Sequence, residues 1–488
     1  MEILNVAIEL APIAKIGGLA DVVLGLPLEL KRQKHKVKII LPKHKLLKTK
    51  EIENLRVYKT VDCIFRKRRY QNTIYKGRVH GLDVYLVEDH TFFHLFDRKK
   101  IYGYKNDSLR FMYFCQVVIE FLKMEKHLPD ILHLHDWHTS LLAYTYKETF
   151  PQAHTKTILT VHNFAYQGVC PPSYFRHVGI QNIPKAFKDQ KTKTQMNLLK
   201  GGLLLADQIV TVSPTFAKEA LKKIIDGRGL ERIVRKIQHK YQGILNGIDY
   251  TIWDPHKDPY LAKKIKNISQ ITFKGWSQCK IANKIDLQKA TKLAKNNKPI
   301  IACVTRLAPQ KGLALIRHAI QYTLKKGGQF VLLGSSANKR SKKSFQNLKR
   351  QMDPNPNAQV YLEHSDRLVH KIFAGADFFI IPSKFEPCGI TQMIALNFGT
   401  LPIVRKTGGL ADTIHDVQDT HAQKKEKNGF VFVPFTKKGI EESIDRAFYF
   451  FEKKPHVLDQ LKQNALHQKF DWKSSCKQYL QVYKKARR

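Results

Sequence analysis

The fold is decided by a stretch in the second half of the chain, which reads FFIIPSKFEPCGIT over residues 378–391. Its first four residues are apolar, so they predict a β-strand that is covered on both faces. Pro382 ends this run, and Ser383, Lys384 and Glu386 follow at once. Gly389-Ile390-Thr391 then precedes a predicted helix at residues 392–397. Strand, polar turn and helix in this order indicate one repeat of an open parallel sheet.

Similar apolar or β-branched runs recur on both sides of this stretch, with helical segments between them. A first strand is expected near the N-terminus, and the further predicted strands are residues 37–41, 84–87, 131–135, 157–162, 208–213, 300–305, 330–334, 359–363, 378–382 and 402–404. Apolar runs that alternate with helices are typical of parallel strands in doubly wound sheets. The chain is therefore predicted to have an α/β fold.

The length of 488 residues indicates two domains. The strand pattern pauses between about residues 243 and 298, so a boundary is expected near residue 250. We therefore predict a domain over residues 1–250, a second over residues 251–460, and a helical, aromatic segment over residues 461–488.

Composition is that of a soluble globular protein, with 43% apolar and 26% charged residues. An acid follows Met1 where an export signal would be basic, and no apolar run reaches the roughly 18 residues of a membrane span. The seven cysteines are scattered, without C-x-x-C spacing, which favours free thiols. These features predict a cytoplasmic protein with no membrane partner.

The net charge is unusual, because 84 basic and 41 acidic residues give +43. Such a balance is consistent with a nucleic-acid partner. However, the basic residues are spread along the chain, with local clusters such as residues 66–69, and no known nucleic-acid-binding module is present. A solvated, Lys-rich surface is the preferred interpretation, and its field would also attract a nucleotide diphosphate.

The pentapeptide GGLAD occurs twice, at residues 17–21 and 408–412. In both places Gly-Gly is expected to follow a strand and to open a helix. Glycine allows close approach of backbone N–H groups to a ligand, and a helix N-terminus favours an anion. The alternative is two tight turns with no ligand.

Ligands of open parallel sheets bind beyond the carboxyl ends of the strands, and charged residues gather at these ends. They are Lys15, Asp136, His162, Arg306, Lys311 and Glu386. The three cations suit a diphosphate, and the other side chains can hydrogen-bond sugar hydroxyls. No D-x-D sequence occurs, which argues against a metal-clamped nucleotide-sugar.

Each of these residues also has a plainer interpretation. Glu386 is placed to cap the following helix, Asp136 to form a turn, and a lone Arg or Lys to lie on the surface. His133, His135 and His138 are a candidate for a metal site, because His133 and His135 face the same side of a strand. Their joint position at strand ends favours a functional site.

At these residues the sequence resembles bacterial and plastid glycogen (starch) synthases. The stretches that carry the resemblance are residues 382–392, 399–402, 408–413, 15–21, 135–138, 161–163, 246–249, 306–307 and 310–312. The resemblance implies two Rossmann-like domains facing across a deep cleft, an acceptor-side domain and a donor-side domain, with a C-terminal helix that crosses back to the first domain. It also implies glucosyl transfer with retention from ADP-glucose to an α-1,4-glucan, without a metal or other cofactor.

The resemblance also implies roles for individual residues. Arg306 and Lys311 would bind the diphosphate, Glu386 would hold the donor glucose, and His162 and Asp136 would position the sugar. The remaining implied contacts with substrate are Lys15, Gly17, Gly18, Asp21, Tyr102, Asn163, Asn246, His364, Cys388, Gly389, Ile390 and Thr391. The leaving phosphate itself would accept the proton of the acceptor hydroxyl.

The chain departs from the family pattern at two positions, where Ile16 replaces a threonine and His364 replaces a tyrosine expected to stack on the base. Related retaining enzymes bind ribose through an acid at the position of Ile394, whereas an uncharged residue there is what this family is expected to have. Two alternatives therefore remain open: a related glucosyltransferase that uses UDP-glucose, or a non-catalytic glucan- or polyanion-binding protein of the same fold.

Overall fold

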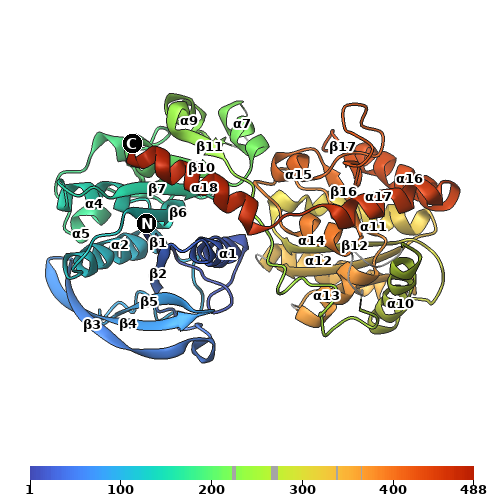
Figure 1. The fold of residues 1–488 in the computed structure, drawn as a ribbon, viewed down its shortest axis with the longest axis horizontal. Helices are drawn as coiled ribbons and strands as arrows, with labels where there is room; N and C mark the ends of the chain where they lie inside the picture. Colours follow the sequence, from blue (N-terminus) through green and yellow to red (C-terminus); the bar gives the residue numbers. More distant parts are fainter. Residues whose placement is uncertain (223–226, 265–272, 337–338, 364) are drawn as a thin grey trace. The chain divides into compact units, whose positions relative to one another are not determined.

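The structure is a computed structural model that describes residues 1–222, 227–264, 273–336, 339–363 and 365–488 (Figure 1). The chain divides into two compact units. The first consists of Met1–Gly247 and Asp471–Arg488, and the second of Ile248–Phe470. The first boundary between the units thus follows Gly247 and not residue 250. The second boundary lies between Phe470 and Asp471, inside the segment predicted as residues 461–488.

The first unit is built on a nine-stranded sheet of order β11-β10-β7-β6-β1-β2-β5-β4-β3. Its parallel strands are β1 (Glu2–Val6), β2 (Lys36–Pro42), β5 (Leu82–Asp89), β6 (Ile131–His135), β7 (Lys156–Val161), β10 (Gln208–Thr211) and β11 (Tyr241–Gly243). The main helices are α1 (Gly18–Arg32), α2 (Asp107–Lys123), α4 (Leu142–Thr149), α6 (Leu198–Leu205), α7 (Pro214–Lys222) and α9 (Glu231–Lys236). The predicted strands of this half are confirmed to within a few residues.

A long antiparallel hairpin, which the sequence analysis did not predict, extends one edge of this sheet. It consists of β3 (Glu53–Phe65) and β4 (Arg68–Val79), and β4 also pairs antiparallel with β5. Arg66 and Lys67 form the turn, with φ of 50° and 64°. Positive φ at both central residues is typical of the two-residue hairpin turns that match strand twist. The basic cluster at residues 66–69 is therefore a hairpin tip.

The second unit contains a six-stranded parallel sheet of order β14-β13-β12-β15-β16-β17. Its strands are β12 (Ile300–Leu307), β13 (Gln329–Ser336), β14 (Ala358–Tyr361), β15 (Phe378–Ile381), β16 (Leu401–Arg405) and β17 (Phe430–Phe432). Its helices include α10 (Phe273–Thr291), α11 (Leu313–Lys325), α12 (Lys339–Met352), α13 (Asp366–Gly375), α14 (Thr391–Asn397), α15 (Gly408–Thr413), α16 (Lys437–Lys453) and α17 (Pro455–His467). The doubly wound α/β prediction is confirmed for both units.

The C-terminal segment is two helices that belong to different units, which corrects the prediction of one helical segment. Helix α17 ends at His467 in the second unit, whereas α18 (Trp472–Arg487) packs on α1 and β7 of the first unit (Figure 1). The break is set by Asp471, whose Oδ1 accepts the backbone N–H of Ser474 at 3.1 Å and so caps α18. Tyr479 and Tyr483 of α18 are fully buried.

All seven cysteines lie in the described part of the chain, and all are buried free thiols. Within the described residues, every helix is too short or too polar to cross a membrane.

Candidate active site

In the first unit, Glu9 organises the segment between β1 and α1. Its side chain is buried, and Oε2 accepts the backbone N–H groups of Ile16 at 2.7 Å and Gly17 at 2.9 Å. Tyr102 donates its hydroxyl to Oε1 at 3.2 Å. The Gly17 N–H is therefore used inside the protein, so the first Gly-Gly pair holds a turn against Glu9.

Lys15 and Asp21 lie on the exposed side of the same turn. The Lys15 Nζ is 2.6 Å from Asp21 Oδ1, and the Lys15 side chain is 46% exposed. Gly18, which is also exposed, is the first residue of α1. The structure thus brings Lys15, Gly17, Gly18, Asp21 and Tyr102 together around Glu9. Glu9 itself was not among the residues predicted from the sequence. A lone acid inside the apolar run at residues 6–14 was the signal that pointed to it.

Asp136 and His162 meet at the carboxyl ends of the neighbouring strands β6 and β7. Asp136 has φ of 58°, and its Oδ1 accepts the backbone N–H of His162 at 2.7 Å. Burial raises the pKa of Asp136 to about 7, although hydrogen bonds from the N–H groups of His162 and Asn163 oppose this shift. Asp136 is the first residue of the short helix α3 (Asp136–Thr139), and its carboxylate is directed at the residue that follows β7.

Two further histidines, His135 and His133, lie in a row next to His162. His162 Nε2 is 3.1 Å from His135 Nδ1, and His133 stacks on His135 with ring centroids 4.4 Å apart. Burial lowers the pKa of both His162 and His133 to about 3, so both are neutral. His162 is thus held as a neutral ring by a second buried ring.

The metal interpretation of the histidines is not supported. Both nitrogens of His133 are hydrogen-bonded, to Thr160 Oγ1 at 2.7 Å and to the Tyr483 hydroxyl at 2.8 Å. Among the residues that the structure describes, no three His, Cys, Asp or Glu side chains are grouped so as to hold a metal ion.

In the second unit, Glu386 is the centre of the polar turn after β15. It is 5% exposed, and its Oε2 accepts hydrogen bonds from Lys311 Nζ at 2.6 Å and from Ser383 Oγ at 2.8 Å. Glu386 does not cap α14, which has no side-chain cap. Ser383 was quoted in the sequence analysis but not assigned to the site, although it directly follows the strand.

Arg306 and Lys311 lie at the end of β12 and in the short turn that follows it. Lys311 is paired with Glu386, whereas Arg306 is exposed and pairs with no acid in the described part of the chain. One cation therefore neutralises the buried carboxylate, and the other is available to an anionic ligand.

The second Gly-Gly pair supports the Glu386 turn by close packing. A Cβ added at Gly408 would lie 1.9 Å from the carbonyl oxygen of Glu386, and one at Gly409 would lie 2.0 Å from that of Cys388. Gly408 also has φ of 45°, which favours glycine. Glycine is required here because two backbone segments touch. The two copies of GGLAD are thus used in different ways.

The remaining predicted site residues are placed as follows. Cys388 is buried, Gly389 has φ of 74°, and Ile390 and Thr391 lead into α14. Asn246 follows β11 and is buried, and its Oδ1 has no hydrogen-bond partner in the described residues. His364 lies outside the described residues.

Comparison with known proteins gives two family-model matches and close full-length relatives. A starch synthase catalytic domain model matches residues 2–236, and a glycosyl transferases group 1 model matches residues 284–466. A glycogen synthase of Protochlamydia amoebophila is 42% identical over 500 residues, covering 99% of both chains. Glycogen synthase 2 of Methylococcus capsulatus is 38% identical over 489 residues, covering 98% of this chain and 99% of that protein.

Solved structures show the same similarity. The catalytic domain of starch synthase IV from Arabidopsis thaliana, bound to ADP and acarbose, has a TM-score of 0.94 and 37% identity. The match covers 100% of this chain and 99% of that one. A sucrose-phosphate synthase from Thermosynechococcus elongatus, with a TM-score of 0.61 and 14% identity over 99% of this chain and 98% of its own, shares the fold alone.

Proposed function

This chain belongs to the glycogen and starch synthase family of glycosyltransferases, and on that premise we propose that it extends an α-1,4-glucan. It transfers glucose with retention from ADP-glucose to the 4-hydroxyl at the non-reducing end. The choice of donor is supported by the ADP bound to the starch synthase IV structure. The observation that carries the function is the buried Glu386, held by Lys311 and Ser383.

We assign recognition of the donor glucose to Glu386. Both measured hydrogen bonds to this carboxylate use Oε2, and Oε1 accepts none from the described residues. A carboxylate oxygen only accepts hydrogen bonds, so Oε1 is suited to accept one from a glucose hydroxyl. The backbone of residues 388–391 would hold further hydroxyls and phosphate oxygens, as the family resemblance implies.

Arg306 and Lys311 are assigned to the diphosphate. Arg306 offers a bidentate fork to phosphate oxygens, and Lys311 adds a point charge that it shares with Glu386. As the bond between the glucose C1 and the phosphate oxygen breaks, negative charge develops on the leaving nucleotide. Fixed cations at that position stabilise the transition state more than the ground state, which accelerates the reaction.

The acceptor attacks C1 from the face on which the nucleotide leaves. The new bond joins C1 to the acceptor O4, and the proton of the 4-hydroxyl goes to the departing phosphate oxygen. Glu386 is poorly suited to act as a base because it is already paired with Lys311. We propose that His162 and Asp136 position the sugar. A neutral imidazole ring and a carboxylate can each accept a hydrogen bond from a sugar hydroxyl.

A cytoplasmic location is part of the same proposal. Seven buried free thiols are compatible with a reducing compartment, and the proposed substrates are a nucleotide-sugar and a glucan. No nucleic-acid partner is needed for this activity.

The test is incorporation of labelled glucose into glycogen from ADP-glucose and from UDP-glucose in parallel. Glu386→Gln should lower kcat/KM by about 10²–10³-fold, because it removes a charge that orients Lys311 and the sugar. Glu452→Gln, at an exposed position on α16 of the same unit, is the matched control and should keep full activity. No transfer from either donor by folded protein would overturn the proposal, and preference for UDP-glucose would overturn its choice of donor.

A further inference from the structure

The side chain of Gln392 lies on the inner side of the Glu386 turn. It is fully buried at the start of α14, and its Nε2 donates to the carbonyl oxygens of Cys388 at 3.2 Å and Gly389 at 3.1 Å. The Oγ1 of Thr413, on α15, is 3.2 Å from the same nitrogen. One amide nitrogen therefore holds two consecutive carbonyl groups of the turn against the interior of the second unit.

The orientation of this amide is fixed by its partners. Carbonyl oxygens only accept hydrogen bonds, and the Thr413 hydroxyl donates its hydrogen to the carbonyl oxygen of Gly409 at 2.7 Å. The amide nitrogen, and not its oxygen, must therefore face all three atoms. An added Cβ at Gly389 would come within 2.4 Å of the Gln392 Oε1. Gly389, with φ of 74°, thus leaves the room that the amide needs.

Because these two carbonyl groups are turned inward, two N–H groups are turned outward. In a trans peptide the C=O and the N–H point in opposite directions, so the N–H groups of Gly389 and Ile390 face away from Gln392. Neither N–H group has a hydrogen-bond partner among the described residues, and both residues are partly exposed. Successive N–H groups at a residue in the left-handed region form a concave site that favours an anion.

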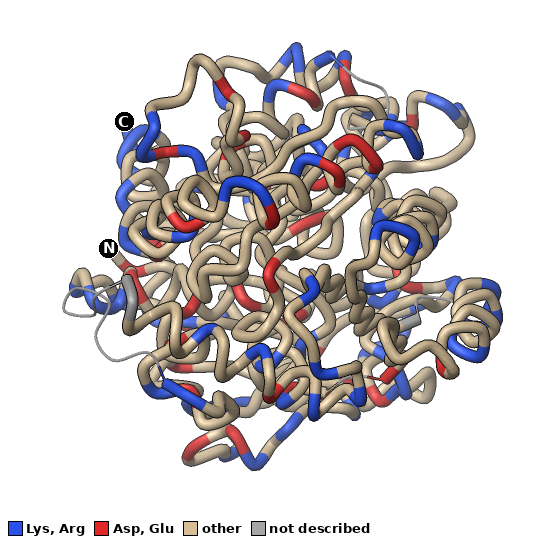
Figure 2. The backbone as a smooth tube through the Cα atoms, turned by 90° about the vertical axis from the view of Figure 1, so that its right-hand side faces the viewer, with Lys and Arg blue, Asp and Glu red and all other residues tan. Residues whose placement is uncertain are grey.

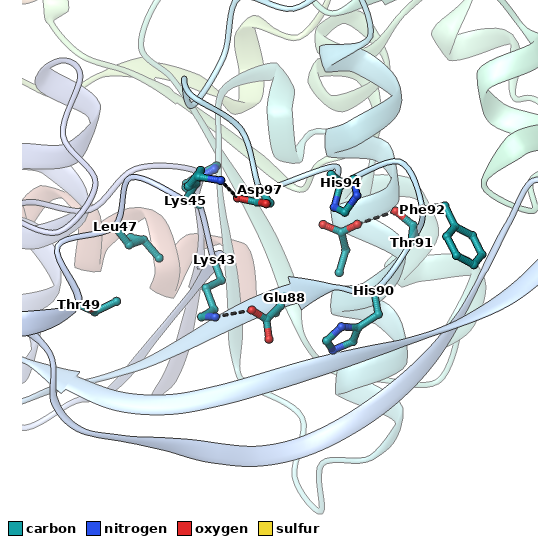
Figure 3. Close-up of a pocket in the computed structure, with 12 residues that line it drawn as sticks. Lys43, Lys45, Leu47, Thr49, Glu88, His90, Thr91, Phe92, His94 and Asp97 are labelled. Carbon is teal, nitrogen blue, oxygen red and sulfur yellow. Dashed lines mark hydrogen bonds and ion pairs between the residues drawn. The ribbon is translucent and has the colours of Figure 1, made fainter.

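Free donors distinguish this turn from the pocket that Figure 3 shows in the first unit. That pocket measures about 540 Å³ and is lined by residues of the stretches 43–49 and 88–97. Its two lysines are matched by acids, because Lys43 pairs with Glu88 and Lys45 pairs with Asp97 at 3.1 Å. An anionic substrate therefore gains more from the Gly389 and Ile390 N–H groups.

We propose that Gln392 is a positioning residue for the leaving diphosphate. This role rests on the proposed function, in which the backbone of the turn holds phosphate oxygens. By fixing two carbonyl groups, Gln392 keeps the Gly389 and Ile390 N–H groups aimed at those oxygens. Gln392 itself touches no substrate, and no covalent bond to it forms or breaks. Donors that are fixed in advance stabilise the charge of the leaving group without reorganisation.

Binding of ADP to the full chain, measured by titration calorimetry, tests this role without turnover. UDP is titrated in parallel because it carries the same diphosphate. Gln392→Met keeps the length of the side chain and loses both amide hydrogens. The dissociation constant of the nucleotide should therefore rise about tenfold, equivalent to about 1.4 kcal/mol.

Gln329→Met is the matched control. Gln329 is also fully buried and donates to a backbone carbonyl, that of Ala294 at 2.8 Å, but it lies at the amino end of β13. This variant should lose a similar free energy of unfolding and keep the nucleotide affinity of the wild type.

Gln392→Glu gives a readout that a loss of stability alone would not change. At high pH its carboxylate has no hydrogen to donate and faces two carbonyl oxygens. As the pH falls, burial favours the protonated acid, whose hydroxyl can donate again. The ratio of its dissociation constant to that of the wild type should therefore fall at least about threefold between about pH 8 and about pH 6.

Nucleotide affinity that is unchanged in Gln392→Met, or that is lowered equally in Gln329→Met, would overturn this role alone. A ratio for Gln392→Glu that does not change with pH would also count against it. A wild-type chain that bound neither nucleotide would overturn the proposed function as well, so the two failures are distinct.

Discussion

At the scale of single residues, Gly408 allows the backbone of α15 to pack closely against the backbone of the Glu386 turn, on which the candidate site depends. Gly408→Ala would place a Cβ 1.9 Å from the Glu386 carbonyl oxygen, so the Glu386 turn must move. We expect kcat/KM to fall at least about tenfold, since small misplacements of a positioned group are costly, together with a loss of about 1–3 kcal/mol in unfolding free energy.

Gly327→Ala separates the effect of this contact from that of backbone strain. Gly327 also has a positive φ, 81°, but a Cβ there would meet nothing within 4 Å. This variant should lose a comparable free energy of backbone strain and keep its activity. Equal activity of the two variants in the glucose-transfer assay would contradict the prediction.

The buried histidines predict a loss of stability in mild acid. The folded-state pKa values of His133, His162 and His44 are about 3, 3 and 4, below the value of 6.5 expected for an unfolded chain. Each depressed pKa contributes stability that is fully present above pH 6.5 and is lost as the pH falls toward the folded-state pKa, about 4 for His44 and about 3 for His133 and His162. The loss is up to about 1.4 kcal/mol per pH unit for each ring.

Urea unfolding at pH 7, 6 and 5 measures this loss. His133→Asn removes one group that takes up a proton on unfolding. The slope of the unfolding free energy against pH should therefore decrease by the contribution of one proton. An unchanged slope would show that His133 does not contribute. The exposed His456, replaced in the same way, is the control.

The residues at strand ends could be predicted because their spacing follows from the strands themselves. Lys311, Glu386, Asp136 and His162 each lie at or soon after a strand that could be recognised as apolar. Glu9 could not be assigned in this way, because two of its partners are backbone N–H groups seven and eight residues later and another is the hydroxyl of the distant Tyr102. Side chains that serve the backbone leave little pattern in a sequence.

At the scale of elements, α18 completes the first unit through Trp472. The ring lies directly over Gly25 of α1, where an added Cβ would come within 2.0 Å of the indole nitrogen. Gly25→Ala should therefore cost about 1–3 kcal/mol of unfolding free energy through overpacking.

A double-mutant cycle tests this contact. Trp472→Phe replaces the indole by a smaller ring, so the double variant should be more stable than the sum of the two single effects, by at least about 0.5 kcal/mol. Strict additivity in denaturant unfolding would show that α18 does not press on Gly25.

Elements with apolar runs were predicted correctly, whereas β3 and β4 were missed. These two strands lie at the edge of the sheet, and many of their side chains are exposed and charged. Without a continuous apolar run they resemble a polar loop in sequence. The break between α17 and α18 was also missed. Asp471, the N-cap of α18, is a single residue in a stretch whose composition is otherwise typical of a helix.

At the scale of the whole molecule, the +43 charge is distributed over both units rather than confined to one element (Figure 2). This agrees with a solvated basic surface. One local concentration is on α12, whose residues Lys339, Arg340, Lys342 and Lys343 are exposed. Like charges at this density repel one another, and salt screens that repulsion.

Thermal stability should therefore rise with ionic strength. Between about 0.01 M and 0.15 M salt, where the Debye length falls from about 30 to about 8 Å, we expect Tm to increase by a few degrees. The double variant Lys342→Glu, Lys343→Glu should raise Tm at low salt and weaken its salt dependence. A Tm that falls with salt in calorimetry would contradict this prediction.

The division of the first unit has a consequence for its biosynthesis. Helix α18 begins at Trp472, so the 224 residues 248–471 must be made after Gly247 before synthesis of this helix begins. At about 5–20 residues per second, the ribosome needs roughly 10–45 s for that interval. During this time the apolar surface that Tyr479, Tyr483 and Trp472 will cover is exposed on the nascent chain. The second unit can complete its fold first, and the nascent first unit is the state on which chaperones would act.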